Sequence, residues 1–154
     1  MRRILEMRGV TADTTLSPGG PGVLDALLEP TVLYPALVQA LLSAGVELHG
    51  MAHITGGGLP ENLPRALPAG VHARLDAASW ERPALFRWLQ ENGEVPEADL
   101  WNTFNLGVGF CLVVPVAAVA QALAVCGEQG HRAWLLGSVE QGESLDAPLA
   151  GLPY

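Results

Sequence analysis

Lysine is absent from this chain, and cations of any kind are few. The eight basic residues are all arginines, against 16 acidic residues, which gives a formal net charge of −8. Only Arg2 and Arg3 are adjacent. Because neutralising a phosphate backbone requires clustered Lys and Arg, the chain is not expected to bind nucleic acid. Any anion must instead be held by single arginines, backbone N–H groups, a metal ion or groups from elsewhere.

Cysteine is scarce, and no long hydrophobic run is unbroken. Cys111 and Cys126 do not make a disulfide framework, and no secretory signal opens the sequence. The most apolar stretch, residues 109–127, is divided by Pro115 and contains Gln121. It therefore reads as a buried strand followed by a helix, and not as a membrane span. These features predict a cytoplasmic protein that does not enter a membrane.

The composition excludes disorder, because 49% of the residues are hydrophobic and only 16% are charged. The length suits a single domain, residues 1–154, with its own core. Apolar periodicity and Pro/Gly punctuation predict helices and strands in mixed order. The expected helices are 1–8, 23–28, 35–43, 61–67, 83–90, 96–104 and 116–128, and the expected strands are 31–34, 47–55, 71–75, 110–114 and 131–139. The expected fold class is α+β, with α/β-type layers: one mixed β-sheet flanked by helices.

Two segments carry no such periodicity. Residues 11–22 are rich in Thr, Ser, Gly and Pro, which predicts a flexible loop. Residues 142–154 are expected to be a loose tail. The first helix has no capping residue before it, which suggests that the chain begins within an element.

The most distinctive local feature is a glycine cluster between a strand and a helix. Residues 53–65 read His-Ile-Thr-Gly-Gly-Gly-Leu-Pro-Glu-Asn-Leu-Pro-Arg. Glycine lets a ligand approach the main chain closely, and the free N–H groups of a helix start attract anions. The spacing matches neither the P-loop nor the dinucleotide fingerprint. A phosphate-binding loop and a tight structural turn are therefore both open.

A second glycine pattern, Asn-Leu-Gly-Val-Gly at residues 105–109, precedes the strand at 110–114. Glycines that enter a buried strand often mark a close approach of backbone, and Asn105 could supply a polar contact. An ordinary helix-to-strand turn explains the same residues.

Metal and thiol chemistry are disfavoured. His49 and His53 lie in an expected strand, where four residues span about 13 Å, too far for one ion. His53, next to the glycine cluster, suits proton transfer or hydrogen bonding better, or it is a histidine satisfied within the core. Neither cysteine has a partner that would make it a nucleophile. The acidic residues Glu91, Glu94, Glu97 and Asp99 read as a solvated surface.

Several segments together resemble one family, the aminoimidazole ribonucleotide synthetases, or phosphoribosylformylglycinamidine cyclo-ligases. Residues 53–65 resemble the family's signature segment, and residues 29–34, Glu-Pro-Thr-Val-Leu-Tyr, resemble its Glu-Pro-Thr-x-x-Tyr strand. Residues 79–90 and the Phe-Asn-x-Gly-x-Gly turn at 104–109 also match. The matching segments occur in the family's order over nearly the whole chain, as its carboxy-terminal domain.

The resemblance implies an ATP-dependent ring closure in purine biosynthesis that converts formylglycinamidine ribonucleotide to aminoimidazole ribonucleotide. It implies ATP and Mg²⁺ as cofactors of the full-length enzyme, which is expected to be a homodimer. The amino-terminal ATP-binding domain is absent from this sequence. We therefore expect the chain alone to bind neither cofactor tightly and to be inactive. One alternative is a domain of another member of the same superfamily, such as formylglycinamidine ribonucleotide synthetase, thiamine-phosphate kinase or selenophosphate synthetase, although their glycine segments look different. The other alternative is a non-catalytic binding module.

Carried onto this sequence, the resemblance implies a site between the two domains. His53 is the candidate catalytic residue, and no residue is assigned to a metal. Val32 and Ala36 stand where the family usually has basic residues, so a phosphate contact is lost or those side chains were peripheral. Arg65 either holds the loop by a salt bridge or touches ligand, and Glu61 and Asn62 either bind substrate or fix the loop. The expected substrate- or phosphate-binding residues are Thr55, Gly56, Gly57, Gly58, Glu61, Asn62, Asn105, Gly107 and Gly109.

Overall fold

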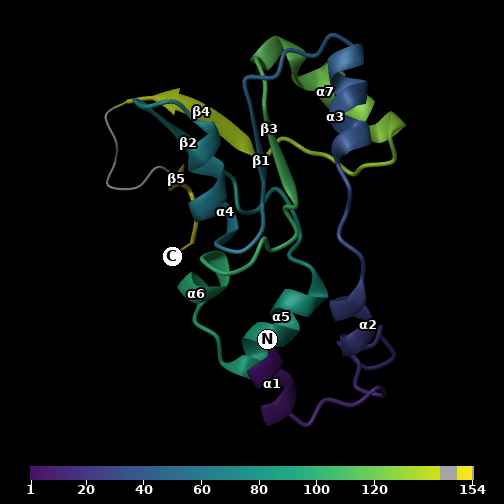
Figure 1. Ribbon diagram of the computed structural model, residues 1–154. Coiled ribbons are helices and arrows are strands. Elements are labelled where there is room, and N and C mark those ends of the chain that lie inside the picture. The colour runs from purple at the N-terminus through teal and green to yellow at the C-terminus, as the bar shows by residue number, and fades with distance from the viewer. Residues whose placement is uncertain (143–148, 154) are drawn as a thin grey trace.

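The computed structural model describes residues 1–142 and 149–153. Its helices and strands are interspersed along the chain, with three helices before the first strand (Figure 1). The α-helices are α1 (Arg2–Met7), α2 (Val23–Leu28), α3 (Pro35–Ser43), α4 (Gly58–Asn62), α5 (Ala84–Gly93), α6 (Glu97–Trp101) and α7 (Val119–Glu128). Two 3₁₀ turns are η1 (Leu63–Ala66) and η2 (Val116–Ala118), and the strands are β1 (Gly50–His53), β2 (Val71–Leu75), β3 (Phe110–Val113), β4 (Gly137–Gln141) and β5 (Leu149–Ala150).

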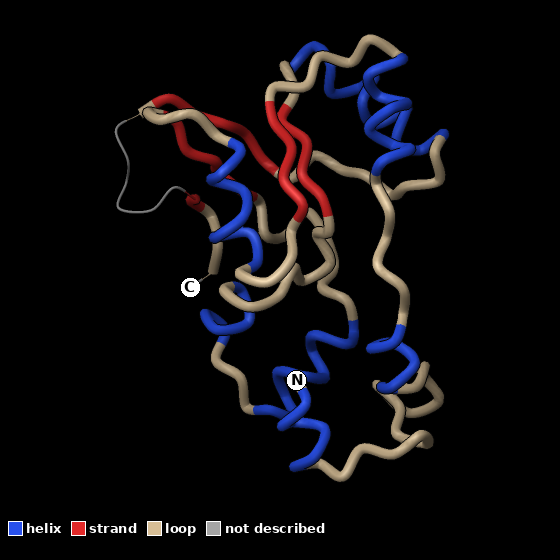
Figure 2. The backbone as a smooth tube through the Cα atoms, in the orientation of Figure 1, coloured by secondary structure: helices blue, strands red, loops and turns tan. Residues whose placement is uncertain are grey.

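The strands form two sheets, where the sequence led us to expect one (Figure 2). In the first, β1 runs antiparallel to β3, with Gly50 opposite Val113 and His53 opposite Phe110. In the second, β2 lies between β4, which is antiparallel to it, and β5, which is parallel. The α+β class, with mixed strands flanked by helices, is confirmed.

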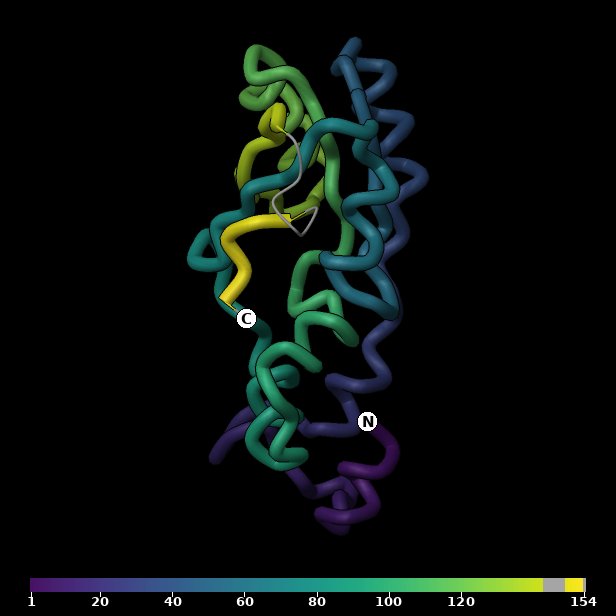
Figure 3. The backbone as a smooth tube through the Cα atoms, turned by 90° about the vertical axis from the view of Figure 1, so that its left-hand side faces the viewer, coloured from purple at the N-terminus to yellow at the C-terminus, as the bar shows by residue number. Residues whose placement is uncertain are grey.

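Three hydrophobic clusters hold the elements together. The largest lies between the two sheets and the short helices α4 and α6, and includes Ile54, Leu59, Leu100 and Leu106. The second joins α3 to α7, which lie side by side in Figure 1, and the third joins α1, α2 and α5 at the other end. The molecule is elongated along the line between these two ends (Figure 3). The glycine segment follows β1 at the middle, against the largest cluster.

Local signals placed most helices well, and proline explains several of their starts. Pro35 occupies the first turn of α3, where its missing N–H costs no hydrogen bond. The expected helix at 61–67 instead begins at Gly58 and tightens into η1 after Asn62. The helix expected at 116–128 likewise starts with the 3₁₀ turn η2. No helix among the described residues is both long enough and apolar enough to cross a membrane.

Three expectations about strands were wrong. Residues 31–34 form no strand: they connect α2 to α3 without a ladder partner. The strand expected at 131–139 runs instead over residues 137–141, as β4. Leu149 and Ala150, placed in the loose tail, pair with Ala73 and Arg74 of β2. Residues 143–148 and 154 of that expected tail lie outside the described residues.

Pairing explains these differences. A β-propensity in the sequence favours extended backbone, whereas a strand also needs a neighbour whose N–H and C=O groups are free. Pro30 and Pro35 flank residues 31–34 and remove two N–H donors, and Tyr34 already has helical backbone angles as the N-cap of α3. Within 11–22, a single bridge joins Thr15 to Gly22.

Candidate functional site

The glycine segment makes a sharp bend between β1 and α4. Gly57 has φ +90° and serves as the N-cap of α4, and Gly58 has φ +59°. Gly58 is buried, and a Cβ there would overlap the carbonyl oxygen of Trp101 and lie 2.7 Å from that of Phe104. Gly58 is therefore required by the packing of α6 against the bend, whatever the bend binds.

Gly56 is the one glycine of this segment with open space in front of it. A Cβ built there meets no atom of the described residues within 4 Å, and its φ lies outside the left-handed region. At Gly57, by contrast, a Cβ would overlap the Glu61 carboxylate. If a ligand approaches the main chain at this bend, it does so at Gly56.

The N–H groups at the bend are not equally available. That of Gly58 donates to the Thr55 carbonyl at 3.0 Å. Among the residues that the structure describes, no hydrogen bond uses the N–H of Gly56 or of Gly57. Helix α4 is only five residues long, so its dipole adds little. Two backbone amides, where we expected three, are thus free for an anion.

Asn62 fixes the bend from inside. Its side-chain amide donates to the carbonyl of Gly56 at 3.1 Å and to that of Gly58 at 2.8 Å, and the residue is only 9% exposed. Of its two expected roles, the structure shows the loop-fixing one. The exposed Glu61 pairs with Arg65 one helical turn later, so Arg65 makes the expected salt bridge.

The 105–109 turn lies beside the bend, and the Ile54 N–H donates to the Gly109 carbonyl at 2.9 Å. Asn105 closes its own turn, because its Oδ1 accepts from the Gly107 N–H at 3.1 Å. Gly107 has φ +102°, and its Cα faces the Pro83 ring. The Asn105 carboxamide oxygen and the Gly107 face are thus engaged within the chain.

Tyr34 fills the space at Gly109 and contacts His53. A Cβ on Gly109 would overlap the Tyr34 hydroxyl. The Tyr34 ring stacks on Phe110, with centroids 4.6 Å apart, and meets His53 edge-on at 5.7 Å. Burial, and secondarily the charge of Cys111, raises the pKa of Tyr34, so its hydroxyl stays protonated. We did not assign Tyr34 to the site from the sequence, although its place in the Glu-Pro-Thr-x-x-Tyr motif was a signal.

A groove of about 510 Å³ opens beside this aromatic group. Its walls come from the 31–34 connection, the start of α3 and the facing ends of β1 and β3. Among the described residues, no arginine and no carboxylate lines it, and His53 is its one basic side chain. Most of its described lining residues are apolar or aromatic, and Thr31, Gln39 and His53 are the polar ones.

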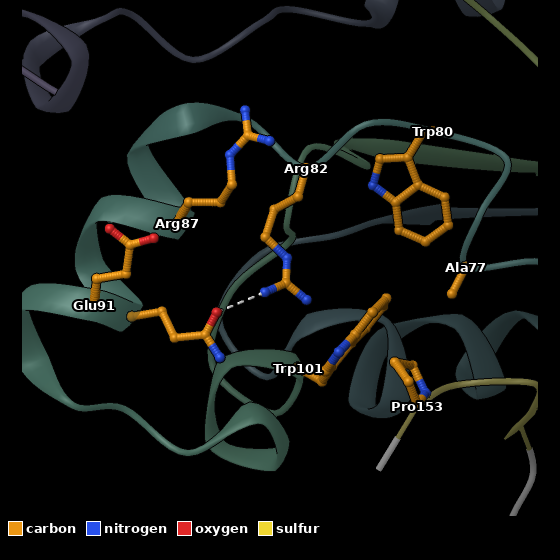
Figure 4. Close-up of a pocket in the computed structure, with 8 residues that line it drawn as sticks. Ala77, Trp80, Arg82, Arg87, Glu91, Trp101 and Pro153 are labelled. Atoms are coloured by element: carbon orange, nitrogen blue, oxygen red, sulfur yellow. Dashed lines mark hydrogen bonds between the residues drawn. The ribbon is translucent and has the colours of Figure 1, made fainter. Parts of the chain in front are cut away.

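A second cavity, of about 410 Å³, lies between α5 and the indoles of Trp80 and Trp101 (Figure 4). Arg82 points into it, donates to Gln90 at 3.0 Å and pairs with Glu97. Hydrogen bonds from Arg82 lower the pKa of Glu97 to about 2, and further bonds from the Trp101 indole and Gln90 act in the same direction. Glu97 is thus an anchored carboxylate, not part of a solvated acidic surface.

This Arg82 network also supports the bend. Trp101 closes α6 with its indole on Glu97, and its carbonyl packs against Gly58. Trp80, whose ring meets Trp101 edge-on at 5.8 Å, donates its indole N–H to the Leu106 carbonyl at 3.0 Å. The network therefore contacts both glycine turns, at Gly58 through the Trp101 carbonyl and at Leu106 through the Trp80 indole.

The described residues do not by themselves provide a Mg²⁺ site. Hard divalent cations favour several converging oxygen ligands. Glu61, the one carboxylate at the bend, is paired with Arg65, and no group of three or more His, Cys, Asp or Glu converges within 1–142 and 149–153. His49 bonds to Glu47 at 2.7 Å instead of joining His53.

The fold and the bend define an α+β domain with an exposed glycine turn, and comparison with known proteins identifies its family. Residues 3–149 match the family described as "AIR synthase related protein, C-terminal domain", and the chain belongs to that family. The resemblance derived from the sequence motifs is confirmed.

Curated relatives carry the name phosphoribosylformylglycinamidine cyclo-ligase. The proteins from Synechococcus sp. (strain CC9605) and Synechococcus sp. (strain RCC307) are 53% and 54% identical over 99% of this chain. That from Prochlorococcus marinus (strain MIT 9313) is 51% identical over the same share. The alignments cover 45%, 44% and 45% of the relatives' own length, so the chain spans less than half of the proteins it matches.

Proposed function

We propose that this chain is the carboxy-terminal part of an ATP-dependent cyclo-ligase that closes the imidazole ring of aminoimidazole ribonucleotide in the cytoplasm. The observation that carries the proposal is identity above 50%, across nearly the whole chain, to proteins named for that activity. The glycine turn with two free amides is a feature suited to an anionic ribonucleotide. The relatives are more than twice as long, so the proposal concerns the full-length protein.

The proposed reaction does not require this chain to form a covalent bond with the substrate. ATP transfers its γ-phosphoryl group to the formamide oxygen of formylglycinamidine ribonucleotide. A nitrogen of the same substrate then attacks the formamide carbon. The C–O bond breaks as the ring closes, and the former formamide oxygen leaves as part of phosphate. Holding both ends of one substrate together makes the attack intramolecular, which lowers its entropic cost. Positioning and charge stabilisation then dominate, as in other phosphoryl transfers.

Within that reaction, we assign anion binding to the bend. The N–H groups of Gly56 and Gly57 would hold a phosphate of substrate or nucleotide, and Thr55 would line the same edge. His53, at the end of β1 and partly oriented by Tyr34, is the candidate for hydrogen bonding or proton transfer. ATP and Mg²⁺ would be held by the rest of the full-length protein, which we expect to be a homodimer, since the described residues offer no set of carboxylates for the metal.

A comparison of the full-length protein with the 154-residue chain tests the reaction. Purified full-length protein should convert formylglycinamidine ribonucleotide and ATP to aminoimidazole ribonucleotide, ADP and phosphate. The chain alone should show no turnover and no tight ATP binding by calorimetry. A full-length protein without this activity would reject the proposal, and turnover by the isolated chain would show that the rest of the protein is dispensable.

Gly56→Val in the full-length enzyme tests the bend. Valine there meets open space and left-handed backbone is not required, so the fold should persist while the side chain covers the free amides. We expect kcat/KM to fall about tenfold or more, equivalent to about 1.4 kcal/mol of lost transition-state binding. Gly127→Val is the matched control, because Gly127 also faces open space without positive φ, and lies on α7. Equal kcat/KM in the two variants would leave the bend a structural turn.

A further inference from the structure

Residues 31–33 present an extended, apolar and unpaired segment on the surface. Leu33 is 77% exposed and Val32 is 51% exposed. Among the residues that the structure describes, no backbone hydrogen bond uses the N–H or C=O of Thr31, Val32 or Leu33. The sequence nevertheless favours a strand there. Such a segment presents unpaired backbone N–H and C=O groups, like the edge strand of a sheet, to which another strand can bind.

The neighbouring surface fits an added strand. Tyr34 anchors the end of the segment by stacking on Phe110 of β3, and the mostly apolar groove of about 510 Å³ lies alongside. Within the part of the chain that the structure describes, the β1–β3 sheet has two strands, and two-stranded sheets are marginal unless another element covers them. Alternate side chains of an incoming strand could enter the groove while its backbone pairs with residues 31–33.

The occupant is indicated by what lies outside the chain. More than half of the relatives' length is not represented here, whereas this chain aligns with them almost from end to end. Position 32 carries valine, and this residue is 51% exposed. An apolar side chain at that position suits a dry protein contact better than a phosphate contact.

We propose that an extended segment from the rest of the full-length protein pairs with residues 31–33 and packs its side chains into the Tyr34–Phe110 groove. This inference rests on the chain being part of a longer protein, and it does not depend on the ring-closing reaction. It assigns Thr31, Val32 and Leu33 to an interface within the subunit.

Amide hydrogen exchange in the isolated chain and in the full-length protein tests the pairing. In the isolated chain at low concentration, the amides of residues 31–33 should exchange close to the rate of unstructured peptide, because they lack hydrogen bonds. In the full-length protein the amides that face the added strand, either that of Val32 or those of Thr31 and Leu33, should exchange about 100-fold more slowly, because successive N–H groups of a strand point to opposite sides. Equal rates in both proteins would overturn the proposal. The proposal would also be overturned if amide exchange in the isolated chain slowed as its concentration rose, because a second copy of the chain would then be the occupant.

Leu33→Glu and the control Val116→Glu separate the interface from general effects of a new charge. Val116 is 92% exposed and lies on η2, away from the groove. Neither substitution should change the thermal midpoint of the isolated chain, because both side chains already face water. In the full-length protein, only Leu33→Glu should accelerate exchange at residues 31–33, by about tenfold or more. An equal response of the two variants would exclude residue 33 from the interface. Neither experiment measures enzyme activity, so a negative result would reject the proposed strand pairing without bearing on the proposed ring-closing reaction.

Discussion

Glu97→Gln is the most informative single substitution for testing the Arg82–Glu97–Trp101 network that packs against the glycine bend. Glutamine keeps the shape of the side chain and removes its charge. Glu97 holds Arg82, accepts from Gln90 at 2.7 Å and accepts from the Trp101 indole at 2.8 Å. Trp101 in turn packs its carbonyl against Gly58, so the change acts on the element behind the bend.

The magnitude follows from the pKa of the carboxyl group. Hydrogen bonds from Arg82 lead the causes that lower this pKa from its ordinary 4.5 to about 2. By linkage, that difference corresponds to about 3 kcal/mol of stability. The Glu97 side chain is 34% exposed and that of Arg82 is 21% exposed, so solvent screening reduces the expected loss to about 1–2 kcal/mol.

The pH dependence distinguishes this charge effect from a packing defect. A lowered pKa stabilises the folded state above the unfolded pKa, near 4.5, and the stabilisation is lost as the pH falls toward 2. Urea denaturation of the isolated chain, followed by tryptophan fluorescence, should therefore show a deficit for Glu97→Gln at pH 7. That deficit should shrink steadily between pH 5 and pH 2.

The exposed pair of Arg87 with Glu81, at 3.0 Å, provides the control. Glu81 and Arg87 side chains are 75% and 52% exposed, so Glu81→Gln should change stability by less than about 0.5 kcal/mol at any of these pH values. A deficit for Glu97→Gln that stays constant from pH 7 to pH 2 would refute the electrostatic argument, and a deficit no larger than that of Glu81→Gln would refute the anchoring role.

Three further changes follow from the same geometry. Gly58→Ala should reduce the free energy of unfolding by about 2–5 kcal/mol, because alanine disfavours left-handed φ and would overlap the Trp101 carbonyl. Gly56→Ala should stay within about 0.5 kcal/mol of the parent, since its Cβ meets open space. Thermal unfolding measures both, and equal midpoints for the two variants would contradict the packing described. Asn62→Ala should lose about 1–3 kcal/mol in denaturant titrations, since two carbonyls lose their donor, and a neutral result would mean that water replaces it. Burial raises the pKa of Cys111 to about 12, so about one thiol in 10⁴ is ionised at pH 8, and alkylation at that pH should require unfolding; rapid alkylation in the folded chain would contradict its burial.

Local chemistry located the glycine turns, but it did not assign a reason to each glycine. From the sequence, Gly56, Gly57 and Gly58 were equivalent candidates for ligand contact. In the structure, Gly58 packs against α6, Gly57 provides the turn and the cap of α4, and only Gly56 faces open space. Which neighbour fills the place of a missing Cβ is a property of residues distant in sequence, so spacing could not reveal it.

Polar residues near the turns show the same limit. Asn62 was open to two roles, and its buried amide bonds assign it to the bend itself. Glu97 looked like one of several solvated acids, because its partner Arg82 lies 15 positions away and on another element. Tyr34 reaches Gly109 and His53 only through the packing of the 31–34 connection against β1 and β3.

The sequence by itself determined the α+β class, the family and the positions of most helices, because these depend on composition, on periodicity and on motifs read in order along the chain. The tertiary structure alone decided that the strands separate into two sheets, that residues 31–34 remain unpaired, and that Leu149 and Ala150 join β2. Strand pairing joins distant residues through backbone groups that every residue carries, so side-chain patterns do not specify which strands will meet.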